Sequence, residues 1–138
     1  MKTYRLLSLL CAALLATGAL AATNYNINVG GVEVNSSNAS NVTGGDIKFQ
    51  SSGGYVSYSS STNTLTLYNV KISRSGSNDR AVHNRGCNNL TIVLKGTCDF
   101  SGSGCSTFKL DRSTTIDVQG ATYINCTSSG DEIGRAHV

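Results

Sequence analysis

The chain contains no proline and no tryptophan, and only 14% of its 138 residues are charged. Proline would remove a backbone donor from a strand ladder, so its absence suits a chain in which nearly every strand is paired on both sides. No segment after residue 21 carries a sustained apolar stripe with a 3.6-residue period, so we predict no helices. Together these absences favour an all-β fold.

Catalytic motifs are missing as well. The sequence has no Gly-x-Ser-x-Gly, no His-Glu-x-x-His and no phosphate-cradling glycine loop. Outside the last seven residues the only histidine is His83, and Asp79, Arg80 and Arg85 lie close to it in sequence. We interpret these as ordinary surface charges and a loop histidine. We therefore expect no catalytic residues and no cofactor, and nothing in the sequence indicates calcium.

Both ends differ from the rest of the chain. Residues 1–21 place Lys2 and Arg5 before an apolar run that ends in the small-x-small pattern Ala19-Leu20-Ala21. This pattern is typical of a removable secretory signal, and the run is too short for a convincing membrane span. We expect the mature chain to begin near Ala22 and to be secreted or held at the cell surface.

The last seven residues, EIGRAHV, resemble the translation of a sequencing-library adapter, in which ATC GGA AGA GCA CAC GTC is followed by a stop codon. We interpret residues 132–138 as an artefact tail and expect the natural chain to continue past Asp131. Residues 22–132 contain eight basic and eight acidic residues, so the domain is about neutral. Neutrality gives no support for nucleic acid or an anionic membrane as a partner.

A repeat unit organises the middle of the chain. When Gly96 is aligned on Gly120, NLTIVLKGTCDF falls on STTIDVQGATYI at an offset of 24 residues, and TLTLYNVKI forms an earlier copy. Each copy has apolar alternation and then a corner residue, Asn69, Gly96 or Gly120, of a type that tolerates positive φ. Alternation with period two predicts strands with one buried face.

A repeat of this length predicts a solenoid, and we expect a right-handed parallel β-helix; a β-sandwich of hairpins is the alternative. Residues 22–131 form the expected domain, in which a cap at about residues 24–50 contains a hairpin around Gly30-Gly31 and the rungs span about residues 51–131. We expect the far end to be truncated. Its open rung would then promote self-association, and the tail Ile133 to Val138 would pack against nothing.

The alignment assigns side chains to faces. The predicted inward columns are Leu65, Ile92 and Ile116; Leu67, Leu94 and Val118; and Ile72, Phe100 and Ile124. The predicted outward columns are Thr66, Val93 and Asp117; Tyr68, Lys95 and Gln119; and Lys71, Asp99 and Tyr123. The inward columns would form the core, and the outward ones have the mixed polar character of a solvated face.

Four cysteines lie beyond the leader: Cys87, Cys98, Cys105 and Cys126. Their spacings do not form a zinc motif, and we predict no metal site. Cys98 falls in an inward column, so we expect a buried thiol. Cys105 and Cys126 lie at nearby positions of successive rungs and are the disulfide candidate, although partners in a missing segment would change this pairing.

Tyrosines are the candidate ligand-binding residues. A flat aromatic ring can cover the C–H face of a sugar. Tyr68 and Tyr123 are predicted to face outward, and so must Tyr55 or Tyr58, depending on the strand register. We take Tyr68, Tyr123 and Tyr58 as candidate carbohydrate-binding residues.

Three segments in order, VGGVEVNSSNASNVTG, GYVSYSSSTNTLTLYNVKI and AVHNRGCNNLTIVLKG, carry a family resemblance. The chain resembles secreted bacterial β-helix proteins labelled as carbohydrate-binding domain proteins. The resemblance implies a β-helix presented outside the cell, with polysaccharide as a possible partner. Two other functions stay open: a structural or adhesive surface stalk, and a fragment of a β-helix polysaccharide lyase.

Overall fold

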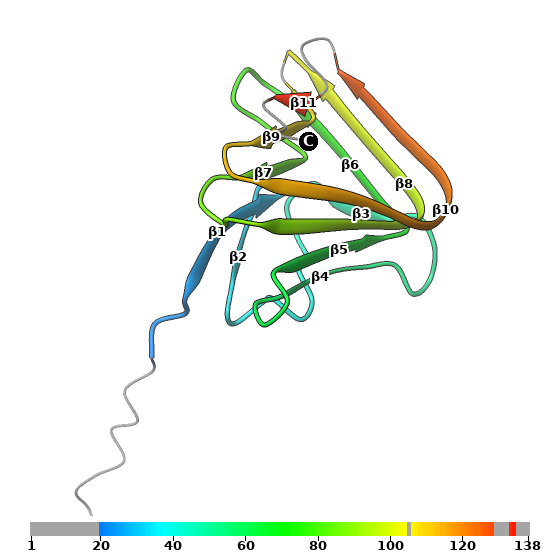
Figure 1. Ribbon diagram of the computed structural model, residues 1–138. Coiled ribbons are helices and arrows are strands. Elements are labelled where there is room, and N and C mark those ends of the chain that lie inside the picture. Colours follow the sequence, from blue (N-terminus) through cyan, green and yellow to red (C-terminus); the bar gives the residue numbers. More distant parts are fainter. Residues whose placement is uncertain (1–19, 105, 129–132, 135–138) are drawn as a thin grey trace, which may run out of the picture.

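The computed structural model describes residues 20–104, 106–128 and 133–134, and this part of the chain is all-β with no helix (Figure 1). The strands are β1 (Asn24–Val29), β2 (Val32–Asn35), β3 (Ile47–Phe49), β4 (Tyr55–Ser59), β5 (Thr64–Tyr68), β6 (Val70–Ser75), β7 (Val82–Asn84), β8 (Leu90–Ser103), β9 (Phe108–Leu110), β10 (Thr114–Ser128) and β11 (Ile133–Gly134). The expected all-β class is confirmed. The predicted leader, residues 1–21, lies almost entirely outside the described residues.

Two tight antiparallel hairpins lie near the amino-terminal end. Strands β1 and β2 meet at Gly30 and Gly31, whose φ values of 56° and 88° suit a two-residue hairpin turn. Strands β4 and β5 are joined by a Ser/Thr/Asn turn that ends at Asn63, with φ 53°. The glycine-centred hairpin predicted from the sequence is confirmed.

The later repeats pair parallel and in register. Strand β8 pairs with β10 so that Ile92 is opposite Ile116 and Leu94 is opposite Val118, which is the predicted 24-residue offset. Strand β5 pairs parallel with β8 and places Leu65 opposite Ile92. In Figure 1, β8 and β10 run side by side along their length. The predicted repeat is therefore confirmed as a parallel pairing.

A bend interrupts each repeat at the predicted corner. Asn69, Gly96 and Gly120 have φ values of 50°, 63° and 56°, which is the left-handed region that asparagine and glycine tolerate best. The Asn69 side chain also links neighbouring corners, since its Oδ1 accepts from the Thr97 backbone N–H at 2.9 Å and its Nδ2 donates to Ser51 Oγ at 2.8 Å. The corner residues thus set the bend and hold adjacent repeats together.

The third predicted column is only partly right. Ile72 lies opposite Phe100 as expected, but the register of β10 shifts after Val118, so that Ile124 is opposite Cys98 and Cys126 is opposite Phe100. The shift arises because β10 has extra residues around its corner, which a fixed offset cannot accommodate. The prediction that Tyr123 lies opposite Asp99 is wrong for the same reason.

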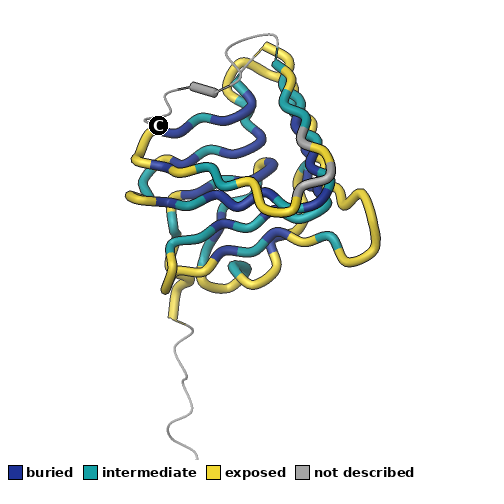
Figure 2. Tube along the Cα trace, turned by 45° about the vertical axis from the view of Figure 1, so that its right-hand side comes forward, coloured by how far each residue is buried: buried dark blue, intermediate teal, exposed yellow. Residues whose placement is uncertain are grey.

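The core consists of the inward side chains of the strands. Leu65, Leu67, Ile72, Ile92 and Phe100 are fully buried. Figure 2 shows burial following the strands, with the connecting loops exposed. Val118 in contrast is 55% exposed, because β10 is paired only with β8 in the described part of the chain. The prediction that Val118 belongs to the buried core is therefore wrong.

Val93 was predicted to be solvated, and this was wrong. Its side chain alternates with those of Ile92 and Leu94, yet it is only 6% exposed. Val93 lies on the central strand, opposite Thr66 on one side and Asp117 on the other. Neighbours on both sides therefore cover a short side chain even on an outward face.

The tail also differs from expectation. Ile133 and Gly134 form β11, which pairs parallel with β9 and places Ile133 opposite Phe108. The prediction that the tail packs against nothing is wrong for these two residues, and residues 132 and 135–138 lie outside the described part. A free strand edge can accept any short extended backbone, whatever its side chains, which explains why a segment without alternation is added there.

Candidate functional site

A partly exposed tyrosine pair lies near the first corner. Tyr68 on β5 is directly opposite Tyr55 on β4, and the ring centroids are 5.5 Å apart with the ring planes tilted by 49°. Tyr55 is 37% exposed, and Tyr68 is half-buried. Lys95 is the next residue in register beyond Tyr68. The three side chains therefore form one row across β4, β5 and β8.

The backbone of the neighbouring repeat makes room for this row. A Cβ atom on Gly96 would come within 2.8 Å of Cε2 of Tyr68 and would overlap Oδ1 of Asn69. The Tyr68 ring thus packs against the corner of the next repeat. A glycine is needed there both for its positive φ and for the space it leaves.

The residues beside the tyrosine pair are mostly hydroxyl-bearing. Ser57 on β4 is opposite Thr66 on β5, and Ser59 is opposite Thr64. The row that contains Thr64 continues to Thr91 on β8. An aromatic row thus runs beside a row of hydroxyl side chains, which is the combination that a sugar requires for its C–H face and its hydroxyl groups.

Tyr58, a predicted binding residue, has a structural role instead. It is 7% exposed, its hydroxyl donates to Asn63 Oδ1 at 2.7 Å, and its ring packs against Tyr25 with centroids 4.7 Å apart. Desolvation by burial raises the pKa of Tyr58, and the adjacent Cys87 thiol raises it further. The register of β4 points Tyr58 inward and leaves Tyr55 as the outward tyrosine, so the assignment of Tyr58 is corrected.

Tyr123 does not join the tyrosine pair. It is 55% exposed, but it follows the Gly120 corner on β10 and lies in register with Thr97. Tyr68 precedes the equivalent corner and lies in register with Lys95. The bend therefore places Tyr68 and Tyr123 on different faces, and the structure brings only one of the three predicted binding tyrosines to the pair.

The cysteine predictions have separate outcomes. Cys98 is a buried thiol, as predicted, and desolvation raises its pKa against the opposing effect of backbone hydrogen bonds. Cys126 is half-buried and packs against the core. Cys105 lies outside the described residues, so the pairing of Cys105 with Cys126 stays a prediction.

A second feature is a polar hollow of about 240 Å³ next to the β1–β2 hairpin. Three arginines line it, Arg74, Arg80 and Arg85, together with Asp79, His83 and Asn28. Four of these residues, Asp79, Arg80, His83 and Arg85, are close together in the sequence, and we interpreted them there as ordinary surface charges and a loop histidine. That interpretation missed Arg74 and Asn28, because strand pairing brings them from distant parts of the chain.

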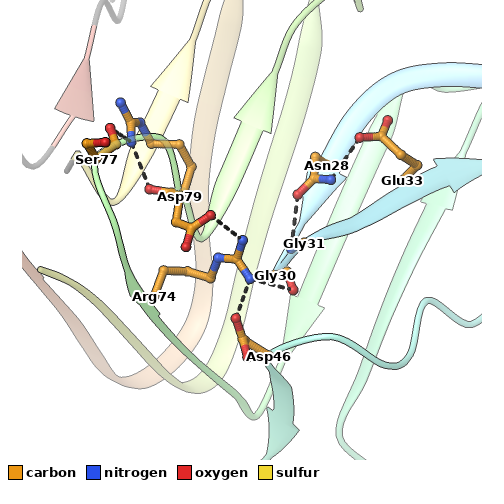
Figure 3. Close-up of polar contacts among 9 residues, drawn as sticks. Asn28, Gly30, Gly31, Glu33, Asp46, Arg74, Ser77 and Asp79 are labelled. Carbon is orange, nitrogen blue, oxygen red and sulfur yellow. Dashed lines mark hydrogen bonds and ion pairs between the residues drawn. The ribbon is translucent and has the colours of Figure 1, made fainter. Parts of the chain in front are cut away.

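Arg74 is the most enclosed cation of the hollow. Its side chain is 16% exposed and bridges two carboxylates, Asp46 through Nη1 and Asp79 through Nη2, the latter at 2.8 Å (Figure 3). Nη1 also donates to the carbonyl of Gly30 at 3.3 Å. Arg74 thereby ties the hairpin turn to the loop after β6, and its charge is already balanced by its own partners.

The remaining charges of the hollow are also mostly paired. Arg85 forms an ion pair with Glu33, which in addition accepts from Asn28 Nδ2 at 2.8 Å. His83 Nε2 lies 2.7 Å from Asp111 Oδ2. No serine, threonine or cysteine is among the described residues that line the hollow. The arrangement suits binding of a polar ligand and contains no nucleophile beside His83.

Comparison with known proteins gave no relative: no family model, no curated protein and no solved structure matches the chain. Within residues 20–104, 106–128 and 133–134, no helix is long and apolar enough to cross a membrane. The same residues contain no group of three or more His, Cys, Asp or Glu side chains that could hold a metal ion.

Proposed function

We propose that the chain is a secreted or cell-surface, non-catalytic module that binds polysaccharide through the face carrying Tyr55 and Tyr68. We infer further that the all-β fold is a right-handed parallel β-helix rather than a sandwich of hairpins. The fold inference is supported by the pairs β5–β8, β6–β8, β8–β10 and β7–β9, which are all parallel, whereas a sandwich of hairpins would pair such strands antiparallel. Each antiparallel pair, namely β1–β2, β1–β7, β3–β6 and β4–β5, includes one of the first four strands. The handedness follows from the general rule for parallel crossovers.

The tyrosine pair is the observation that carries the binding proposal. Two tyrosines opposite one another on an exposed strand face, with Lys95 beside them, offer aromatic surface for a sugar ring and a donor for its oxygens. Strands β4, β5 and β8 extend this face with serine and threonine hydroxyls. An elongated face of this kind fits a polymer better than a single small molecule.

The expected secretory leader and the near-neutral mature segment support the extracellular assignment. A surface or secreted protein would meet polysaccharide before any intracellular ligand. Neutrality also leaves recognition to the local chemistry of the face, because no strong overall charge steers the partner.

A retention assay on insoluble polysaccharides tests the proposal. The chain from Ala22 onward should be retained on at least one member of a panel of neutral and acidic polymers. Tyr55→Ala and Tyr68→Ala should each lower retention about tenfold, because loss of one stacked ring removes on the order of 1.4 kcal/mol.

Tyr123→Ala is the matched control, because Tyr123 is also exposed but lies past the corner on another strand. It should leave retention unchanged. Lack of retention on every polymer, or an equal loss in all three variants, would contradict the proposal.

A further inference from the structure

Arg80 differs from the other arginines of the hollow. Its Nη1 donates to two backbone carbonyls, Ser77 O at 3.1 Å and Asp79 O at 2.8 Å. Among the described residues no carboxylate lies within ion-pair distance of it, whereas Arg74 and Arg85 each have one or more. Within the described part of the chain, Arg80 therefore carries a positive charge without an ion-pair partner at the wall of the hollow.

Nε of the Arg80 guanidinium also lacks an acceptor among the described residues. Nε of Arg80 is buried without a hydrogen-bond partner in the described part of the chain, as is Nε of Arg74, and both hydrogen bonds of Arg80 come from Nη1. Arg80 differs from Arg74 in that its Nη atoms bond no carboxylate of the described residues. A buried donor without an acceptor destabilises the protein by about 1–3 kcal/mol, so this arrangement favours an acceptor supplied from outside. A guanidinium has a planar fork of donors that matches a carboxylate.

The nearest acidic side chain is already engaged. Asp79 accepts from Arg74 at 2.8 Å, and Arg74 is shared with Asp46. These contacts hold the Asp79 carboxylate on Arg74 rather than on Arg80, as Figure 3 shows for the Asp46, Arg74 and Asp79 group. The same contacts fix the loop that carries Arg80, so the fork is positioned before any ligand arrives.

The size and lining of the hollow limit the ligand. Its volume of about 240 Å³ is below the range of about 300–1,000 Å³ typical of drug-sized ligands. A single sugar ring with one charged group is therefore a suitable size. Asn28, His83 and Arg85 provide further polar atoms for the hydroxyl groups of such a ring.

We propose that this hollow binds one uronate residue of an acidic polysaccharide, with Arg80 as the contact for its carboxylate. The proposal rests on the polysaccharide-binding function above, and it names the class of sugar and a second, separate contact point. Because the contact is a charge-assisted hydrogen bond, binding should weaken as the salt concentration rises.

Calorimetric titration with monomeric galacturonate tests the site apart from the tyrosine face. The chain from Ala22 onward should bind galacturonate at millimolar concentration and bind galactose at least tenfold more weakly, since galactose lacks the carboxylate. Arg80→Gln should lower the affinity for galacturonate about tenfold or more. Arg80→Lys, which keeps the charge without the fork, should restore part of the affinity.

Controls separate this proposal from the first. Arg112→Gln changes an exposed arginine outside the hollow and should have no effect, and Tyr68→Ala should leave galacturonate binding intact while lowering polymer retention. Binding of galacturonate that is unchanged in Arg80→Gln would overturn the assignment. Equal affinity for galactose, or tighter binding of inorganic phosphate than of galacturonate, would overturn it too, because the site would then not select a uronate.

Discussion

Replacement of Gly96 by alanine tests how tightly successive repeats stack at the corner. Gly96 has φ 63°, and an added Cβ would overlap Asn69 Oδ1 and approach Tyr68 Cε2 to 2.8 Å. Gly120 is the equivalent residue of the next repeat and has φ 56°, but its added Cβ would meet no atom within 4 Å. The two glycines thus share the backbone requirement and differ only in what packs against them.

The two substitutions should therefore destabilise the protein by different amounts. Both place alanine in the left-handed region, which destabilises by about 1–2 kcal/mol. Gly96→Ala must also displace the Asn69 side chain, whose Oδ1 accepts from the Thr97 N–H at 2.9 Å, and this adds about 1 kcal/mol for the hydrogen bond. Overpacking against Tyr68 adds about 1–3 kcal/mol more. We expect a loss of about 3 kcal/mol or more for Gly96→Ala and about 1 kcal/mol for Gly120→Ala.

Urea unfolding of the chain from Ala22 onward, followed by circular dichroism, measures both losses. Gly120→Asn provides a further control and should be nearly neutral, because asparagine tolerates positive φ and already adopts it at Asn69. Equal losses for the two alanine variants, or a neutral Gly96→Ala, would refute the stacking of Tyr68 and Asn69 on the next corner.

Leu94→Asp places a charge in the buried column, where Leu94 is 3% exposed, and should prevent folding. Lys95→Asp changes the next residue, which faces out, and should change the free energy of unfolding by less than about 0.5 kcal/mol. Equal effects of the two substitutions in urea unfolding would mean that the assigned facing of these side chains is wrong. Burial raises the pKa of Tyr58 in the folded state, so only the unfolded chain loses the tyrosine proton as the pH passes its ordinary pKa of about 10. The free energy of unfolding should therefore fall as the pH rises above that value, and it should fall less in Tyr58→Phe. An unchanged dependence of the free energy of unfolding on pH in Tyr58→Phe would contradict the burial of this hydroxyl. We also propose that the chain from Ala22 onward self-associates through the outer edge of β10, where Val118 is 55% exposed. Analytical sedimentation should show less self-association for Val118→Lys than for the unchanged chain. A monomer at all protein concentrations would contradict the proposal.

The parallel repeat could be predicted from the sequence because two independent signals coincide. Apolar alternation marks the strands, and Asn69, Gly96 and Gly120 mark the bends at matching positions. Register depends strongly on such alternation, since a slip by one residue would turn every apolar side chain to solvent. This explains why the pairing of Ile92 with Ile116 agrees with the alignment.

The failures have equally local causes. The register shift in β10 depends on how extra residues bulge near Gly120, and the burial of Val93 depends on neighbours from two other strands. Tyr55 and Tyr58 differ in facing by one step of register, which the residues alone left open. Composition and apolar alternation predict which segments form strands. They predict the local backbone geometry at a bend less well.

The polar hollow was beyond prediction for a different reason. Arg74 and Asp46 lie far apart in sequence, as do Arg85 and Glu33, and only the pairing of β1 with β7 and of β3 with β6 brings these segments together. Arg80 matters because no carboxylate among the residues that the structure describes pairs with it, and this becomes evident only once the partners of Arg74 and Arg85 are known. The sequence indicated the charged segment but not which of its charges was unbalanced.

The parallel stacking of the repeats can be tested most directly by interstrand nuclear Overhauser effects between backbone protons of β8 and β10 in the isotope-labelled chain. We predict cross-peaks that connect the backbone around Ile92 with that around Ile116, and the backbone around Leu94 with that around Val118, in the same chain direction. Cross-peaks that instead connect Ile92 with Val118 and Leu94 with Ile116 would mean antiparallel strands and would contradict the account.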